Sequence, residues 1–410
     1  MDAATNLHID RIRGADRIAS LYILRGIAIL FILFMNIPWM GGYEFILFDP
    51  RYPTWTAADY WTTLFARTFL EGTQRGLLEL LFGAGIMIMA RRAMTPDGPV
   101  EVADLHYRRN FWLCTFGLAN AFVLLWFGDI LLVYGLGAVF LFPFRKLGPK
   151  AQCGLAAIFL AAVLLYNVAG YREESSRLQQ VERIQATAAT GKAISEQDKA
   201  ALKEHQERVD RRVQMPADNA KAKEKIAKAD KAHHSTFGAY WNAQLEGWTF
   251  LMAHFFWVIE AEIVATMLIG MALFQWGVIQ GRARRSIYWA MLVLGYGIGV
   301  SLRGSHWLEL LQFRPGQHWQ AILFDFSRLA VCLGHLALVQ LALGSAFGRR
   351  LLSPFQAAGR MPLTIYLFTS VLMMWVIFAP WGFDLFGKWG QAEMMVVAGI
   401  VVVAELIAAN

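Results

Sequence analysis

The sequence predicts an all-α polytopic membrane protein of about ten transmembrane helices, with one polar helical insertion. Of its 410 residues, 57% are hydrophobic and 14% are aromatic, which is more apolar than a soluble protein. The apolar residues lie in long runs, and about 20 such residues cross the roughly 30 Å bilayer core as a helix. Lys and Arg gather at the ends of those runs, where signals of membrane orientation belong.

Ten apolar runs are expected to cross the bilayer. The run 111–144 is divided at Gly128–Asp129, because its 34 residues are too many for one crossing. Ten crossings place every short basic cluster on the side of the N-terminus, which predicts that both termini are cytoplasmic. The runs lie at 19–40, 59–90, 111–127, 130–144, 151–170, 247–278, 287–302, 319–346, 362–379 and 392–409.

A charged insertion interrupts the apolar runs. Residues 172–231 contain 14 Lys or Arg and 11 Asp or Glu, a composition that favours helix but offers little continuous apolar face. We expect an extracytoplasmic, solvated helical hairpin divided at Pro216, or alternatively a segment that binds an envelope protein. The predicted segments are an N-terminal lead, a membrane block of about five spans, the insertion and a second block of about five spans, at 1–18, 19–170, 171–246 and 247–410.

Composition and motifs exclude several classes of function. The net charge of +7 comes from basic residues at helix ends, so it does not indicate nucleic-acid binding. Cys114, Cys153 and Cys332 lie in apolar segments at unrelated spacings, which fits buried thiols and argues against a disulfide framework or a metal site. The chain contains no P-loop, dinucleotide fingerprint, HExxH or GxSxG motif.

Five stretches of the chain form a recognisable set. Four of them are LLFGAG at 80–85, FGDIL at 127–131, MLIGMAL at 267–273 and GRMPLTIYL at 359–367. The fifth is the first span, where the relevant residues are Ser20, Leu21, Leu24, Arg25, Gly26, Ala28, Ile29 and Asn36. Together these stretches resemble the YeiB-type family of bacterial inner-membrane proteins.

The resemblance implies a multi-pass protein of the bacterial inner membrane. The opening motif is also similar to that of transmembrane acyltransferases, which implies transfer of an acyl group from a donor such as acyl-CoA onto an extracytoplasmic acceptor. Three positions depart from the family pattern. Tyr22 replaces an acidic residue, Asn120 replaces a His, and Ile365 replaces an Asn. Each change bears on whether this member is catalytic.

The most informative polar residues are Arg67, Glu71, Arg75 and Glu79. Their spacing of four places them on successive turns of one helix with alternating charge, so each Arg can pair with a Glu. Such a row must face a protein interior or a wet cavity, because charges are costly in lipid. Two interpretations stand: pairing that fixes helix packing, or a polar cavity lined by Arg75 and Glu79 in which Glu71 acts as a base.

Further polar residues lie within or beside the predicted spans. Asp129 is expected to cap the helix that follows it, or to line the cavity. Glu260 and Glu262 are two positions apart, point to different faces and so do not share a metal; one of them is expected to pair with a basic group from another helix. The resemblance adds three possible cavity-lining residues, Asn36, Asn120 and Tyr366.

Two arginines are expected at similar depth near the cytoplasmic side. Arg25 and Arg360 together can hold an anion such as the phosphates of an acyl carrier, or each can contact lipid phosphate at the interface. In another span, Asp325 and Arg328 are three positions apart and are expected to neutralise each other. His335 is expected to form a hydrogen bond between helices, or to relay protons.

The sequence leaves three functions open. The leading hypothesis is acyl transfer across the bilayer, with acid–base catalysis by Glu71 or His254. The second is a small-solute transporter or ion-coupled permease, because intramembrane Glu, Asp and His suit proton coupling. The third is a non-catalytic scaffold that binds an envelope partner through residues 172–231.

Overall fold

The computed structural model describes residues 15–43, 49–50, 54–90, 101–213, 220–312 and 318–410. Within these ranges every regular element is a helix and none is a β-strand, which confirms the predicted all-α fold. Six helical stretches there are long and apolar enough to cross a bilayer, so the chain is a polytopic membrane protein. They are Ala19–Gly41, Pro149–Ala189, Phe237–Gln275, Arg285–Leu310, Trp319–Leu343 and Gln391–Ala409.

The remaining predicted spans are helical but shorter, interrupted or more polar. The run 59–90 consists of α4 (Ala57–Phe65), the π-helix η1 (Ala66–Leu70) and α5 (Thr73–Ala90). The run 111–144 contains the end of α6 (Glu101–Phe122), then α7 (Leu131–Leu141) and η3 (Phe142–Lys146). The run 362–379 divides into α16 (Pro362–Val371) and the π-helix η6 (Leu372–Ile377). The number of ten crossings therefore stays a prediction.

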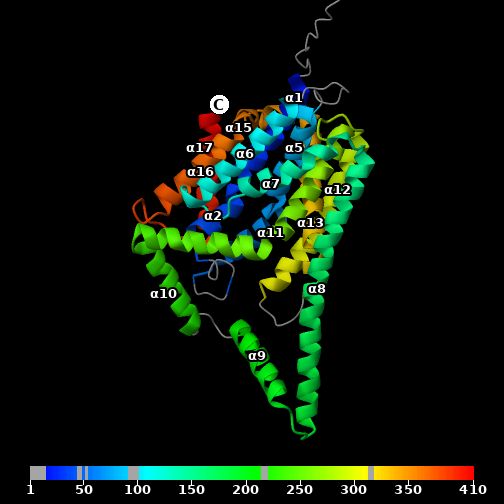
Figure 1. Ribbon diagram of the computed structural model, residues 1–410. Coiled ribbons are helices and arrows are strands. Elements are labelled where there is room, and N and C mark those ends of the chain that lie inside the picture. Colours follow the sequence, from blue (N-terminus) through cyan, green and yellow to red (C-terminus); the bar gives the residue numbers. More distant parts are fainter. Residues whose placement is uncertain (1–14, 44–48, 51–53, 91–100, 214–219, 313–317) are drawn as a thin grey trace, which may run out of the picture.

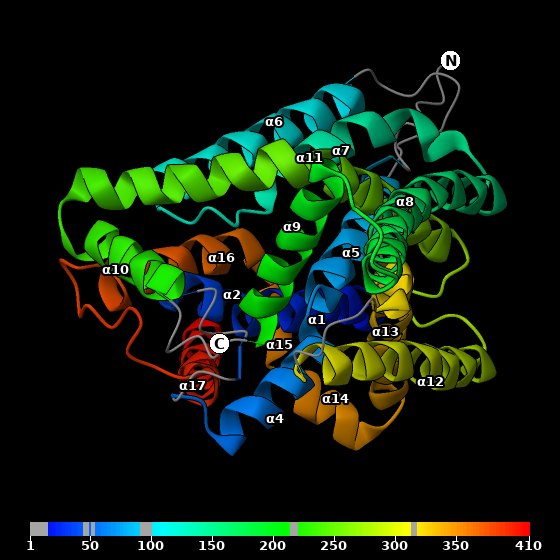
Figure 2. The same cartoon turned by 90° about the horizontal axis from the view of Figure 1, so that it is seen from below.

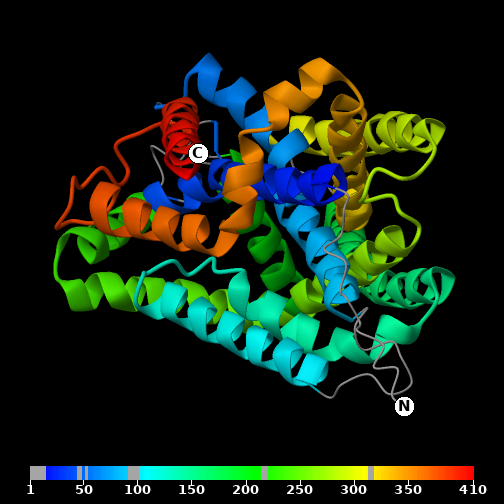
Figure 3. The same cartoon turned by 90° about the horizontal axis from the view of Figure 1, so that it is seen from above.

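The first span lies in the middle of the molecule. Seen from above, α1 (Ala15–Phe31) is surrounded by the other helices (Figure 3). It packs closely on α15 (Phe355–Arg360), because both helices carry glycine at their contact: a Cβ on Gly26 would lie 2.0 Å from the Phe355 carbonyl oxygen, and one on Gly359 would lie 1.8 Å from that of Tyr22. The first stretch of the set thus lies against the last.

Two more stretches of the set pack together. A Cβ on Gly83 of α5 would lie 2.0 Å from the Met267 carbonyl oxygen of α11 (Phe237–Gln275), and one on Gly270 would lie 2.2 Å from that of Leu80. Gly83 therefore allows a close approach of α5 and α11. Gly85 has no such role, since a Cβ there would meet nothing within 4 Å.

The charged insertion projects beyond the bundle. In Figure 1, α8 (Pro149–Ala189) continues well past the lower end of the other helices, and α9 (Glu196–Val213) and α10 (Ala220–His234) follow it. The start of α1 and the C-terminus lie at the opposite, upper end. The expected boundary at residue 171 falls inside the continuous helix α8, and Pro216 lies outside the described residues.

The chain returns to the bundle through α11. Its first part lies across the lower end of the bundle (Figure 1), and, apart from Tyr240, its buried residues begin at Glu262. Seen from below, α10 lies at the edge of the bundle (Figure 2). The other helices are α2 (Leu33–Gly41), α12 (Arg285–Leu310), η5 (Trp319–Leu323), α13 (Phe324–Leu343), α14 (Ala346–Leu352) and α17 (Gln391–Ala409).

Candidate functional site

Four charges from three helices meet in the centre of the bundle. Arg75 and Glu79 come from α5, Glu262 from α11 and Arg328 from α13. The Arg75 Nη2 atom lies 2.5 Å from Glu262 Oε2 and its Nε atom lies 3.5 Å from Glu79 Oε1. Arg328 contacts Glu262 and lies 3.4 Å from Glu79 Oε2. Two cations and two anions give this central cluster a net charge of zero.

A break in the helical run 59–90 supplies further partners for the buried arginines. Gly72, with φ of +69°, separates η1 from α5, so several carbonyl groups lack the usual helical donor. Arg303 of α12 donates to the carbonyl oxygens of Arg67 at 2.7 Å, Thr68 at 3.0 Å and Glu71 at 2.8 Å. Arg303 is only 1% exposed, so its charge is held within the protein.

Two more side chains from α13 complete this arrangement. Arg328 Nη1 donates to the Gly72 carbonyl oxygen at 3.0 Å, and His335 Nε2 donates to that of Phe69 at 2.8 Å. The Tyr296 hydroxyl donates to His335 Nδ1 at 2.7 Å. The predicted hydrogen bond of His335 between helices is thus confirmed, and an interrupted backbone is stabilised where lipid would leave it unpaired.

The charged row therefore faces inward and is paired. Arg67 contacts Glu71, which also lies 3.3 Å from Arg303, so the carboxylate first considered as a base is bound by two guanidinium groups. Glu262 takes the expected pairing with basic groups of other helices. Asp325 and Arg328 form no direct ion pair among the described residues: Asp325 accepts a hydrogen bond from Asn167 of α8 at 3.1 Å, and Arg328 contacts the central cluster, from which it attracts Asp325 at longer range.

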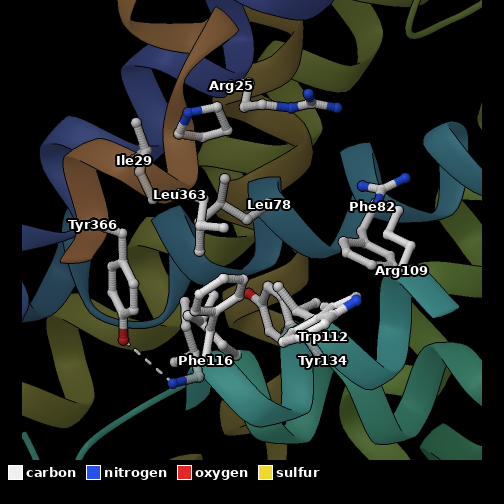
Figure 4. A pocket seen from close by; sticks show the side chains of 14 residues that line it. Arg25, Ile29, Leu78, Phe82, Arg109, Trp112, Phe116, Tyr134, Leu363 and Tyr366 are labelled. Atoms are coloured by element: carbon white, nitrogen blue, oxygen red, sulfur yellow. Dashed lines mark hydrogen bonds between the residues drawn. The ribbon is translucent and has the colours of Figure 1, made fainter. Parts of the chain in front are cut away.

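A pocket of about 410 Å³ lies between α1, α5, α6, α7 and α16. Its walls are mostly aromatic and aliphatic, and among the described residues that line it Arg25 and Arg109 carry a charge. Figure 4 shows both guanidinium groups at one end and Tyr366 at the other. The lining residues are Arg25, Ile29, Leu78, Phe82, Arg109, Trp112, Leu113, Phe116, Ile130, Leu131, Tyr134, Pro362, Leu363 and Tyr366.

The two arginines of the pocket lack anionic partners. Neither Arg25 nor Arg109 forms an ion pair with a carboxylate of the described residues, and the two cations repel each other. The Arg109 guanidinium lies 5.1 Å from the centre of the Phe82 ring. Tyr22, at the position of the family's acidic residue, supplies no compensating carboxylate. This end of the pocket therefore carries excess positive charge.

The opposite end of the pocket leads to a buried carboxylate. Asp129 accepts hydrogen bonds from Asn120 Nδ2 at 2.8 Å and from the Tyr366 hydroxyl at 3.4 Å. It also accepts from the backbone N–H of Leu132 at 3.0 Å, which confirms its predicted capping of the following helix. The Tyr366 hydroxyl in turn accepts from the N–H of Ile130 at 3.3 Å. Asp129, Asn120 and Tyr366 thus form one hydrogen-bonded group.

The remaining predicted site residues lie apart from the pocket. Arg360 is exposed at the end of α15 and does not line it. His254 is exposed on α11 and bonds the Phe250 carbonyl oxygen of its own helix at 2.9 Å. Glu260 lies against Gly137 of α7, and its Oε1 atom is buried without a partner among the described residues. Asn36 is half-buried in α2.

Local sequence patterns do not single out Arg109 and Arg303. Arg109 belongs to a basic cluster at the end of an apolar run, a pattern that indicates membrane orientation. Arg303 lies at the end of a predicted span, where an arginine commonly reaches the interface. No local pattern marks Arg303, because its acceptors are carbonyl groups freed by the interruption at Gly72 in a distant part of the chain.

Comparisons with known proteins agree with the motif set. Residues 273–410 match a family described as "Protein of unknown function (DUF418)". The chain is 26% identical over 411 residues to the uncharacterized protein YxaH of Bacillus subtilis (strain 168), covering 96% of this chain and 89% of YxaH. It is 30% identical over 154 residues to the uncharacterized protein YeiB of Escherichia coli (strain K12), 37% of this chain and 36% of YeiB. No solved structure matches.

Proposed function

We propose that this chain is a membrane protein of the YeiB type and that it binds an anionic amphiphile in the pocket between Arg25 and Tyr366. The observation that carries the proposal is the pair of arginines without carboxylate partners at one end of an otherwise apolar pocket. A phosphate or carboxylate head group would neutralise both guanidinium groups. An acyl chain would lie along the aromatic and aliphatic walls.

Binding of a fluorescent phosphatidic acid to the purified protein in detergent tests this proposal. Arg25→Gln and Arg109→Gln should each weaken binding by roughly tenfold or more, the effect of losing a charge-assisted hydrogen bond worth about 1.5–3 kcal/mol. Arg360→Gln, which changes an exposed arginine outside the pocket, is the matched control and should bind as the unchanged protein does.

The companion probe is the matching phosphatidylcholine, whose head group is zwitterionic. It should bind more weakly than phosphatidic acid to the unchanged protein, and the difference should shrink in both arginine variants. Equal affinity for the two lipids, with no effect of either substitution, would remove the basis of the proposal.

Acyl transfer is the second candidate function, and one observation favours it. Asp129 is hydrogen-bonded to Tyr366 at the end of the pocket away from the arginines. A carboxylate there can accept the proton of an acceptor hydroxyl as its oxygen attacks the acyl carbonyl carbon, and the donor thiol or alcohol then leaves. Asn120, which bonds Asp129, cannot take over that proton as the family's His would.

A transfer assay with radiolabelled acyl-CoA and a hydroxyl-bearing acceptor tests this second function. Asp129→Asn should abolish product formation, whereas Asn120→His, which places an imidazole beside Asp129, should raise its rate. Product formed equally by all three proteins would assign the chemistry elsewhere.

The central cluster supports a structural role. Its charges are mutually paired, and its arginines also bind carbonyl groups of the interrupted helix. In a transporter, buried charges of this kind would instead bind the solute or exchange protons. If that function holds, Glu71→Gln, which changes a carboxylate of the same charged row, should alter solute uptake into proteoliposomes. A non-catalytic scaffold is the alternative if the pocket binds lipid but catalyses no reaction of it.

A further inference from the structure

The end of the charged insertion is fastened to the opposite side of the bundle from the termini. Three segments meet there: the end of α10, the residue Tyr43 that follows α2, and the loop 378–388 that follows η6. The Tyr43 hydroxyl donates to Asp230 Oδ1 at 2.6 Å. Loop and α2 are also joined directly, because the Gly387 N–H donates to the Gly41 carbonyl oxygen at 2.7 Å.

His233 is the centre of this contact. It is only 4% exposed, and its Nε2 atom donates to the Phe378 carbonyl oxygen at 2.7 Å. Its ring stacks on Phe386, with centres 3.9 Å apart and planes 17° apart, and Tyr240 lies edge-on against it. A neutral imidazole suits this largely aromatic setting, whereas an imidazolium would be a poorly solvated cation.

His234 lies beside it in a different setting. Its Nδ1 atom is 2.9 Å from Asp384 of the loop, and its Nε2 atom is 3.3 Å from Asp230 of its own helix. Lys388 lies 3.6 Å from Asp384. The charged and titratable groups facing the two histidines are therefore Tyr43, Asp230, Tyr240, Asp384 and Lys388.

We propose that His233 and His234 form a latch that holds the charged insertion against the bundle and releases it on acidification. The segments that the latch joins all belong to this chain, so this inference does not depend on the function of the pocket. Release would expose the ring faces of Phe386, in the loop after η6, and of Tyr240, in α11, that now contact His233. The start of α11 and that loop would then no longer be held to α10.

The direction of the pH effect follows from His233. Burial lowers its pKa to about 4, against about 6.5 for a free histidine. The released form therefore takes up a proton at higher pH than the docked form. Docking is complete above about pH 6.5 and is lost as the pH falls toward about 4.

Distance measurement by double electron–electron resonance tests the latch in the full-length protein. Spin labels are placed at exposed Lys228 of α10 and exposed Arg284 at the other end of the bundle, after replacement of the three native cysteines. One narrow distance is expected at pH 7.5, replaced by a broad distribution on acidification, with a midpoint between about pH 4 and 6.5.

Two variants connect the release to His233. His233→Phe keeps a ring against Phe386, and His233→Gln keeps a donor for the Phe378 carbonyl; neither side chain titrates, so both should hold the narrow distance at pH 4.5. His254→Phe, at an exposed histidine outside the latch, should behave as the unchanged protein. His234→Gln loses the ring contacts with Asp230 and Asp384, which weakens docking, so the insertion of this variant should be released at a higher pH than that of the unchanged protein.

Two results would overturn the latch. One is a narrow distance in the unchanged protein down to pH 4. The other is release of His233→Phe or His233→Gln with the same midpoint as the unchanged protein.

Discussion

At the scale of single residues, the arginines of the membrane part differ in exposure and in what surrounds them: Arg303 and Arg328 are buried, whereas Arg25 is half-buried and Arg109 is exposed. Arg328 and Arg303 find carboxylates and backbone carbonyl groups, so their charge is neutralised within the protein. Within the described part of the chain, Arg25 and Arg109 find neither, although both line the same pocket. Since an arginine in a bilayer is costly unless paired or hydrated, this contrast separates a structural cluster from a binding site.

Removal of Arg328 should destabilise the protein strongly. Arg328→Met would leave Glu79 and Glu262 with Arg75 as their shared cation, and breaking a buried pair in this way costs about 3–5 kcal/mol. Unfolding in mixed detergent and sodium dodecyl sulfate measures the change. Arg208→Met, which removes a surface pair with Glu204 on α9, should change stability by less than about 1 kcal/mol. Similar losses in both variants would contradict the structural role of the cluster.

At the scale of elements, the recognisable stretches are contact surfaces between helices. The first span packs on the stretch 359–367, and the stretch 80–85 packs on 267–273, with glycine at each contact. Small residues at these contacts need no catalytic explanation. The FGDIL stretch differs, because its Asp129 is turned toward Tyr366 and the pocket.

Substitution at the contact of α1 and α15 should therefore affect folding. Gly26→Ala places a methyl group 2.0 Å from a backbone oxygen, so one helix must shift, and overpacking of this kind costs about 1–3 kcal/mol. Gly399→Ala on α17, where nothing lies within 4 Å, should be neutral or slightly stabilising. Thermal unfolding of both variants in the same detergent gives the comparison; equal melting temperatures would refute the close contact.

The charged row at residues 67–79 was predictable from the sequence only in part. Spacing of four and the cost of charge in lipid predict that Arg67, Glu71, Arg75 and Glu79 face a protein interior or a wet cavity, where each Arg can pair with a Glu. The same spacing assumes an unbroken helix, and the interruption at Gly72 was not predicted because a single glycine is compatible with a helix interior. The partners Arg303 and Arg328 depend on how distant helices pack, which local patterns do not encode.

At the scale of the whole molecule, three features lie in different parts of the described structure. The central cluster holds α5, α11 and α13 together; the pocket lies beside it between α1, α6 and α16; and the latch fastens the insertion at the end away from the termini. With the predicted topology, the latch is extracytoplasmic, and Arg25 and Arg109 lie toward the cytoplasmic end of the pocket. An anionic ligand would then enter with its head group on the cytoplasmic side.

A high-resolution structure of the protein in lipid nanodiscs tests the central claim most directly. We expect elongated density in the pocket, with a phosphate or carboxylate group within about 3 Å of both the Arg25 and Arg109 guanidinium groups and a chain running toward Tyr366. An empty or water-filled pocket in nanodiscs containing anionic lipid, with both arginines turned out to the bulk head groups, would contradict the proposed binding site.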